Sequence, residues 1–332
     1  MAIETIFQDR KPCYFIAEVG CNHNGSLPQA LRMIQVAKDA GADAAKFQVF
    51  HADELYATDD PEYIKLKGEE LSFDDFRTIQ ETCKQVGIDF LATPFDLPSV
   101  DFLETLDVAA YKIGSGELDY LAFLRHVAAT GKSILLSTGM GDDPLIDRAV
   151  QEVRRAGCTQ LALLHCVSAY PAPLTAANVR ALDTLAQRYD VPVGFSDHSL
   201  EPAASYAAVA RGARIIEKHF TLSRQSPGDD HPMSLEPAEL AATIAIIRDI
   251  EAAMGDGKII IGPSEAPTLR LARRSLYAGS DIAAGELFTT DNIRVRRPQH
   301  AVTADQLDTV LGRRSSRNIA ADTPITQECI DA

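Results

Sequence analysis

The sequence lacks several features that would mark a secreted or membrane protein. Its 332 residues include six cysteines but no CxxC pair, and no apolar run approaches the ~20 residues of a membrane-spanning helix. Residues 1–10 lack the layout of a secretory signal. Scattered cysteines in a chain of this length are typical of a reduced compartment. We therefore expect a cytoplasmic protein that does not act in a membrane.

Positive charge is also scarce. The chain has 32 Lys and Arg against 47 Asp and Glu, which gives a formal net charge of −15 at pH 7. Because such a chain repels the phosphates of DNA and RNA, the charge argues against nucleic acid as the main partner. Hydrophobic residues make up 46% of the chain, which is enough for a sizeable core and too many for a disordered protein.

Lysine is absent after Lys258, and this absence indicates a domain boundary. Residues 262–332 contain nine arginines and nine acidic residues, so residues 1–261 carry the whole net charge. A stretch rich in proline and glycine, residues 261–267, lies at this change. We therefore predict two domains, residues 1–261 and residues 262–332.

Residues 1–261 repeat one pattern, in which a short apolar run is followed by a loop and a helix-like stretch. The predicted strands are 14–19, 44–49, 88–92, 109–113, 134–137, 161–166, 191–195 and 214–219. The predicted helices are 28–40, 73–86, 121–129, 144–156, 176–188, 202–211 and 237–254. Eight strand–helix units in about 250 residues are typical of a (β/α)8 TIM barrel. A doubly wound α/β sheet is the alternative, but no GxGxxG follows the first strand, so we predict the barrel.

The second domain is predicted to be small and rich in β-structure. Short alternating pieces, separated by turn signals, replace the helices there. The predicted strands are 275–278, 286–289, 293–296 and 316–319. A compact domain of roughly 60 residues fits this pattern.

Polar residues collect where the predicted strands of the first domain end. They are Glu18, Lys46, Gln48, Thr93, Lys112, Ser137, His165, Ser196, His198, Glu217 and His219. A single lysine in an apolar run is usually structural, with its amine in solvent. A polar group at the same end of every strand instead indicates an active site, because that end carries the chemistry of such barrels.

His198 and His219 end neighbouring predicted strands, whose backbones lie ~5 Å apart. Two imidazoles at that separation can hold one ion, with water and substrate oxygens as the remaining ligands. Mn²⁺, Co²⁺ or Zn²⁺ suits such an open site. The alternative is that both are ordinary hydrogen-bonded histidines.

Lys46 and Lys112 predict an anion site. Together with Ser115, Ser137 and Ser196 they supply charge and directed hydrogen bonds. The glycines beside them could serve only tight turns, but that alternative leaves the two lysines unexplained.

Glu18 and Glu117 are candidate acid–base groups. A carboxylate beside a metal can take a proton from bound water. Either glutamate could instead pair with one of the two lysines, and the two roles are compatible.

Several short sequence motifs of this chain occur in the same order as in one known family. They are FIAEVGCNHNG (15–25), GADAAKFQ (41–48), YKIGSGE (111–117), LSTGM (136–140), LHC with YP (164–171), GFSDH (194–198) and IEKHF (216–220). Together they resemble the sialic acid synthase family, the phosphoenolpyruvate-dependent N-acylneuraminate and nonulosonate synthases. The resemblance runs from about residue 14 to residue 330.

The resemblance implies a role for each residue at a matching position. It implies that His198 and His219 bind a divalent metal, usually Mn²⁺, and that Glu18 is a catalytic carboxylate near that metal. The implied phosphoenolpyruvate contacts are Lys46, Lys112, Ser115, Ser137 and Ser196. The implied sugar contacts are Gln48, Glu117, Tyr170, Asp230 and Arg297. The implied reaction joins phosphoenolpyruvate to an open-chain N-acylated mannosamine-type sugar, which gives a nine-carbon 2-keto acid and phosphate.

The resemblance also extends to the second domain, which is similar to a type III antifreeze protein (a SAF domain). It implies a domain-swapped homodimer, in which Arg297 reaches over the barrel mouth of the other subunit and meets the N-acyl group of the sugar. The family usually has a glycine pair after Arg297-Pro298, where this chain has Gln299-His300-Ala301. We expect this difference to change how Arg297 meets the sugar.

Other functions stay open from the sequence. The main alternative is the same chemistry on a 2,4-diacetamido-trideoxyhexose, which gives legionaminic- or pseudaminic-type acids. The string AEVG (17–20) resembles the neuraminic and legionaminic branches more than the pseudaminic branch. A carbohydrate-binding protein without catalysis has no use for the lysine–serine site, and an aldolase with Lys46 or Lys112 as a Schiff base is a further alternative.

Overall fold

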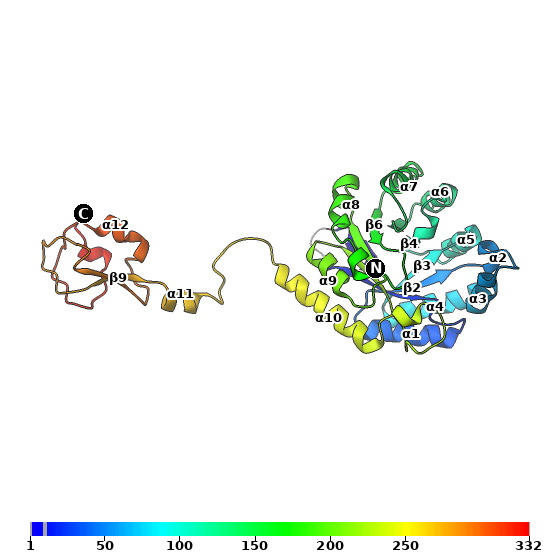
Figure 1. Ribbon diagram of the computed structural model, residues 1–332, viewed down its shortest axis with the longest axis horizontal. Helices are drawn as coiled ribbons and strands as arrows, with labels where there is room; N and C mark the ends of the chain where they lie inside the picture. Colours follow the sequence, from blue (N-terminus) through cyan, green and yellow to red (C-terminus); the bar gives the residue numbers. More distant parts are fainter. Residues whose placement is uncertain (1, 9–11, 332) are drawn as a thin grey trace. The chain divides into compact units, whose positions relative to one another are not determined.

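The computed structural model describes residues 2–8 and 12–331. The chain divides into two compact units, Met1–Gly255 and Asp256–Ala332, and each is described by itself (Figure 1). The change in composition comes slightly later, after residue 261. The sequence of residues 1–10 was predicted not to be a secretory signal, and part of this segment lies outside the described residues. No helix in the described part of the chain is long and apolar enough to cross a bilayer.

The first unit is a closed barrel of eight parallel strands, which confirms the predicted fold class. The strands follow one another in chain order around the barrel, and β8 pairs back with β1 through Tyr14 and Ile215. They are β1 (Tyr14–Gly20), β2 (Ala44–Val49), β3 (Asp89–Pro94), β4 (Ala110–Ile113), β5 (Ser133–Ser137), β6 (Leu161–Cys166), β7 (Val193–Asp197) and β8 (Ile215–His219).

Helices surround the barrel (Figure 1). They are α1 (Leu27–Asp39), α2 (Ala52–Leu55), α3 (Pro61–Glu69), α4 (Phe73–Val86), α5 (Leu97–Thr105), α6 (Leu121–Ala129), α7 (Asp143–Arg155), α8 (Ala181–Tyr189), α9 (Ala203–Ala210) and α10 (Pro237–Met254). Three of these helices begin at an N-cap side chain. Ser26, Asp96 and Asp142 accept hydrogen bonds from backbone N–H groups in the first turns of α1, α5 and α7.

Two details differ from the predicted helices. The sequence pattern gave no sign of α2, α3 or α5. The helix predicted at 176–188 begins only at Ala181, because Asn178 adopts a left-handed conformation (φ 40°) that no α-helix can include.

Strand alternation places the polar cluster inside the barrel. Residues such as Ile16, Ala44, Ala110 and Ile215 form one apolar layer within it, closed from below by Ile3 and Ile6 of a short 3₁₀ helix, Ala2–Phe7. Side chains two residues further along a strand point the same way. Therefore Glu18, Lys46, Lys112 and Glu217 form the next layer, towards the carboxyl ends of the strands.

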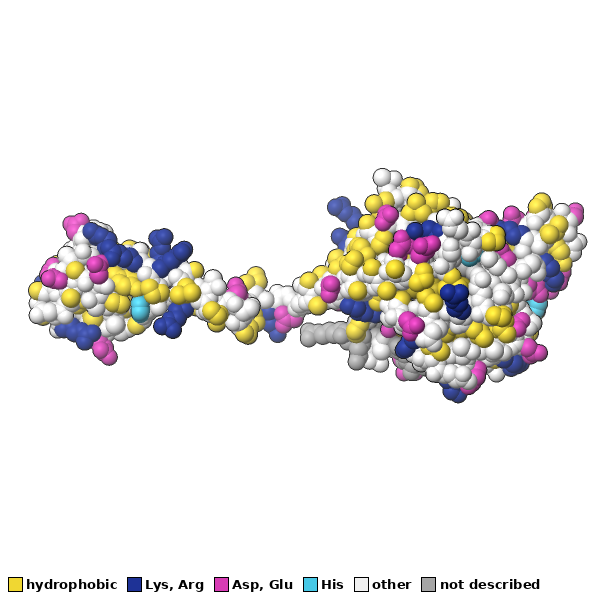
Figure 2. All heavy atoms as spheres, turned by 90° about the horizontal axis from the view of Figure 1, so that it is seen from below, with side chains coloured by type: hydrophobic (Ala, Val, Ile, Leu, Met, Phe, Trp, Pro, Cys, Tyr) yellow, Lys and Arg dark blue, Asp and Glu magenta, His cyan; other side chains and the backbone are white. Residues whose placement is uncertain are grey.

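The second unit contains a small antiparallel sheet of β9 (Ser275–Ala278) and β10 (Ile293–Arg296). The helices α11 (Ala266–Ala272) and α12 (Leu307–Val310) belong to it. The predicted strands 286–289 and 316–319 are wrong, because these segments make only isolated bridges, such as Leu287 with Arg314, between turns. Its own apolar core includes Leu276, Phe288 and Ile325. Figure 2 shows basic side chains at several places on the surface of this unit.

Candidate active site

Four charged side chains lie buried together inside the barrel. The Lys46 ammonium is 2.9 Å from a carboxylate oxygen of Glu18 and 3.6 Å from one of Glu217. The Lys112 ammonium is 3.7 Å from the other oxygen of Glu217. Each side chain is at most 5% exposed. The cluster contains two ammonium and two carboxylate groups, so its formal charges balance and each buried charge has a partner of opposite sign.

The pKa values of the two carboxyl groups are shifted in opposite directions. Burial works to raise the pKa of Glu217, but Lys112, Lys46 and a hydrogen bond from Ser196 lower it to about 2. Burial raises the pKa of Glu18, and Lys46 only partly opposes this effect. Glu217 therefore stays ionised as the partner of both lysines, while Glu18 is the carboxylate suited to take up and release a proton.

A cavity of about 230 Å³ lies above this cluster. Lys112 donates to the Ser137 hydroxyl (2.6 Å), and the backbone N–H of Gly139 donates to the Ser115 hydroxyl (3.1 Å). Both serines line the cavity together with Lys46. Ammonium groups and hydroxyls converging on one small space are the donors that a phosphate or carboxylate group needs.

His198 and His219 lie at the rim of the same cavity, with ring centroids 5.6 Å apart. The Nδ1–H of His198 donates to the Val167 carbonyl (2.9 Å), which leaves its Nε2 as an acceptor, 3.5 Å from the Ser196 hydroxyl oxygen. Burial, then His219, lowers the pKa of His198 to about 4, so the ring is neutral at pH 7. The buried Nδ1 of His219 has no hydrogen-bond partner and is 3.4 Å from Asp230.

The two imidazoles fit a divalent metal as ligands, since the ring of His198 is neutral and the buried Nδ1 of His219 has no hydrogen-bond partner. Among the described residues, no group of three or more His, Cys, Asp or Glu is arranged to hold a metal. A metal held by these two histidines would take further ligands from water or substrate, as in an open site.

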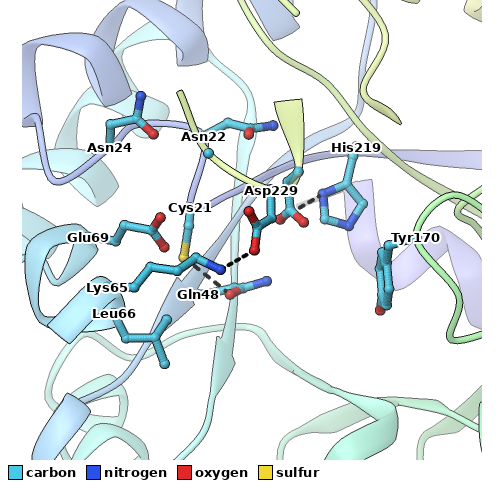
Figure 3. Close-up of a pocket in the computed structure, with 12 residues that line it drawn as sticks. Cys21, Asn22, Asn24, Gln48, Lys65, Leu66, Glu69, Tyr170, His219 and Asp229 are labelled. Carbon is cyan, nitrogen blue, oxygen red and sulfur yellow. Dashed lines mark hydrogen bonds and ion pairs between the residues drawn. The ribbon is translucent and has the colours of Figure 1, made fainter. Parts of the chain in front are cut away.

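A second cavity, of about 200 Å³, adjoins the first. Gln48, Tyr170 and His219 line both, so the two spaces share a boundary at these three residues. Beyond that boundary the second cavity is lined by Asp230 and by residues of α3 and of the loop after β8 (Figure 3). The geometry thus provides two lysines for an anion at one end of the first cavity, which we call the basic end, and an adjoining space for a second substrate.

Glu117 lies beside the first cavity, in a short 3₁₀ helix, Ser115–Glu117, after β4. Its Oε2 is buried without a hydrogen-bond partner. Gly114 makes room for this carboxylate, because a Cβ at that position would lie 2.6 Å from Oε2. Burial raises the pKa of Glu117 to about 7.

The raised pKa makes the stability contribution of Glu117 dependent on pH. The folded state holds this proton more tightly than the unfolded state, so wild-type stability falls as pH rises from about 4.5 to about 7, by up to about 3 kcal/mol. We expect Glu117→Gln to remove this loss. The Tm of the variant minus the Tm of the wild type should therefore be several degrees larger at pH 8 than at pH 5. Thermal unfolding at both pH values tests this, with Glu81→Gln on exposed α4 as the control.

Most predicted site residues of the first unit therefore meet around the two cavities. Arg297 belongs to the second unit, where it is exposed just after β10. Three contributors were given no role from the sequence. Glu217 was named only among the polar residues at the strand ends. It pairs with both lysines, a role that its position two residues before His219, on the same strand face, could have indicated. Lys65 and Glu69 belong to α3, which the sequence pattern did not predict.

Comparisons with known proteins agree with this architecture. The NeuB family profile matches residues 33–259, and the SAF domain profile matches residues 273–331. The chain is 37% identical to N,N'-diacetyllegionaminic acid synthase of Legionella pneumophila, over 96% of this chain and 95% of that protein. It is 33% identical to N-acetylneuraminate-9-phosphate synthase of Homo sapiens, over 96% and 93%.

A solved structure extends the comparison. The crystal structure of the N-acetylneuraminic acid synthetase of Leptospira borgpetersenii, in complex with citrate, has a TM-score of 0.74 with this chain at 37% identity, over 78% of this chain and 90% of that one. The eight-stranded barrel, the buried lysine–glutamate cluster and the C-terminal SAF domain are thus found in one chain that belongs to the NeuB family of synthases.

Proposed function

We propose that this enzyme condenses phosphoenolpyruvate with an open-chain N-acylated amino sugar to give a nine-carbon 2-keto acid and phosphate. The observation that carries the proposal is the pair of buried lysines, Lys46 and Lys112, which face a small cavity that His198 and His219 also line. Two lysines that can bind an anion, beside two histidines that can bind a metal, suit a reaction between an anionic substrate and a carbonyl substrate.

Phosphoenolpyruvate is proposed to bind at the basic end. Lys46 and Lys112 supply the positive charge that its phosphate and carboxylate need. Without these lysines, the net charge of −15 would repel the anionic substrate. Ser115, Ser137 and Ser196 supply directed hydrogen bonds from hydroxyls that already line the cavity. When phosphoenolpyruvate is bound by these lysines and serines, its methylene carbon is proposed to point towards the boundary with the second cavity.

The sugar is proposed to lie in the second cavity, with its aldehyde at the boundary. Gln48, Tyr170 and Asp230 line that space, and the unpartnered oxygen of Glu117 is available beside the first cavity as a further acceptor for the sugar. A divalent metal held by His198 and His219, Mn²⁺ in this proposal, polarises the aldehyde when it is bound.

The bond changes follow from this placement. The phosphoenolpyruvate methylene carbon attacks the aldehyde carbon, the aldehyde C=O π electrons pass to its oxygen, which takes up a proton to become a hydroxyl, and C2 becomes an oxocarbenium centre. Water adds to that centre, and Glu18 is the group proposed to take its proton, since burial raises the pKa of this carboxyl. The resulting intermediate loses phosphate by cleavage of the C2–O bond, which leaves the 2-keto acid.

Two acceptors are proposed, in order. The first is N-acetylmannosamine, and the second is a 2,4-diacetamido-trideoxymannose, the acceptor class that suits the relative named for N,N'-diacetyllegionaminic acid. We further propose a domain-swapped homodimer, in which Arg297 of one subunit contacts the N-acyl group in the barrel of the other. Its exposed side chain in a separate unit is available for such a contact.

The test is phosphate release from phosphoenolpyruvate with Mn²⁺ and each sugar in parallel. With ¹⁸O in the bridging C2–O position, the label is expected in the released phosphate. EDTA is expected to abolish release, and added Mn²⁺ to restore it. Absence of release with every sugar, or label retained in the keto acid, would contradict the proposal. Borohydride trapping of a protein–keto acid adduct would instead favour the Schiff-base aldolase.

A further inference from the structure

A buried ion pair lies directly behind the two histidines. Asp197 precedes His198 at the end of β7, and Lys218 precedes His219 at the end of β8. The Lys218 ammonium is 3.3 Å from a carboxylate oxygen of Asp197, and each side chain is 1% exposed. Neighbouring residues of a strand point to opposite faces, so the ion pair lies on the outer face of the barrel wall, while the histidines line the cavity.

The backbone pairing of these two strands ends at the same place. Asp197 and Lys218 are partners in the last register position between β7 and β8. His198 follows β7, whereas His219 is the last residue of β8. The pairing of β7 with β8 therefore does not extend to the two histidines, and their separation depends on contacts beyond it.

Lys218 contacts both residues that flank His198. Besides its ion pair with Asp197, its ammonium donates to the backbone carbonyl of Ser199 (2.6 Å). The Asp197 carboxylate in turn accepts from the backbone N–H (2.9 Å) and the hydroxyl (2.6 Å) of Ser199. These hydrogen bonds close a tight turn with His198 at its middle. The residue directly before His219 thus holds both ends of the turn that carries the other histidine.

The ion pair is also tied to the surrounding helices. The Ser205 hydroxyl, on α9, donates to the second carboxylate oxygen of Asp197 (2.6 Å). The other buried residues of α9 are apolar, namely Ala204, Ala208 and Val209. Burying two charges in such a layer is costly, and an apolar pair of similar size often stabilises a fold equally well. What an ion pair with directed hydrogen bonds adds is a fixed geometry.

We propose that Asp197 and Lys218 are positioning residues, which set the separation of His198 and His219 and thereby the affinity of the enzyme for its divalent metal. This inference rests on the metal site of the proposed function. Neither Asp197 nor Lys218 lines either of the two cavities, so both act through the histidines. Groups that orient metal ligands from outside typically change metal affinity by roughly 10- to 100-fold.

The experiment titrates the metal-free, full-length protein with Mn²⁺ and measures the free ion by electron paramagnetic resonance, without any substrate. We expect Lys218→Met and Asp197→Asn each to raise the Kd for Mn²⁺ by roughly tenfold or more. Each single variant also leaves a buried charge without its partner and should lower the Tm. At saturating Mn²⁺ the KM for phosphoenolpyruvate should stay at the wild-type value, because Lys46 and Lys112 keep their contacts.

The double variant, Asp197→Asn with Lys218→Met, separates positioning from stability. It removes both charges, so neither is left buried and unpaired, and most of the lost Tm should return. This variant can therefore be measured even if a single variant does not fold. The contacts from residue 218 to the turn around His198 are still missing, so the Kd for Mn²⁺ should stay at the raised value. Metal affinity that returned together with the Tm would contradict the proposal.

Tyr111→Phe is the matched control for a general loss of stability. Like Lys218, Tyr111 is a buried strand residue that directly precedes a residue of the cavity, here Lys112. Its hydroxyl donates to Glu104 of α5 (2.7 Å), in the surrounding helices. We expect this variant to lower the Tm and to leave the Kd for Mn²⁺ unchanged.

His219→Ala separates failure of this inference from failure of the proposed function. If the wild-type protein bound Mn²⁺ no better than His219→Ala, the metal site of the proposed function would be rejected, and this inference with it. If binding required His219 but kept its wild-type Kd in Lys218→Met and Asp197→Asn, only the inference would be overturned. Strand pairing and the Ser196–Glu217 hydrogen bond (2.9 Å) on the inner face would then be enough to place the histidines.

Discussion

Lys112→Met is expected to lower kcat/KM for phosphoenolpyruvate by roughly 10²- to 10³-fold. Lys112 is one of two buried ammonium groups that face the first cavity, and its Nζ donates to the Ser137 hydroxyl and to the Ile113 carbonyl (3.1 Å). Methionine fills a similar volume without the charge. The variant also leaves Glu217 with Lys46 alone as a cationic partner, so the cavity becomes net negative and repels the substrate.

Steady-state phosphate release and calorimetric titration with phosphoenolpyruvate measure this effect. Lys218→Met is the matched control, because Lys218 is equally buried but pairs with Asp197 (3.3 Å) and donates to the Ser199 carbonyl (2.6 Å), away from the cavity. We expect the control to lower the Tm and to keep the KM for phosphoenolpyruvate. An unchanged KM in Lys112→Met would remove this lysine from the substrate site.

The barrel and its polar layer could be predicted because both depend on local periodicity. Each strand is short and apolar, and most helices carry a start or stop signal, such as the left-handed Gly87 that ends α4. Alternation along a strand then determines which residues share the interior. Ile16 and Glu18, for example, face the same way, so the end of β1 could be assigned to the site before the structure was known.

The parts that sequence reasoning missed do not depend on such a pattern. Helix α3 has no buried residue and no apolar stripe at helical spacing, and yet it supplies Lys65 and Glu69 to the second cavity. The pairing of Glu217 with two lysines is a contact between β8, β2 and β4, and only closure of the barrel brings these strands face to face. In the second unit, isolated bridges replaced two predicted strands because turns interrupt the pairing.

Glu18→Gln is expected to lower kcat by roughly 10³-fold or more while phosphoenolpyruvate and Mn²⁺ still bind. The amide has the shape of the carboxylate but takes up no proton from the attacking water. Lys46 loses its contact at 2.9 Å but keeps Glu217 at 3.6 Å, so the anion site retains both ammonium groups. With one negative charge fewer beside the substrate, affinity for phosphoenolpyruvate should stay the same or increase.

Three measurements distinguish this role from a structural one. Calorimetry should give a dissociation constant for phosphoenolpyruvate no weaker than that of the wild type, and Mn²⁺ titration followed by electron paramagnetic resonance should give unchanged metal binding. Glu18→Asp, which keeps a carboxylate on a shorter side chain, should recover part of the lost kcat. If Glu18→Gln turned over at the wild-type rate, Glu18 would have no part in delivering water. If both variants instead lost phosphoenolpyruvate binding, Glu18 would act by holding Lys46 in place, because their ion pair is the shortest contact in the cluster between two groups of opposite charge.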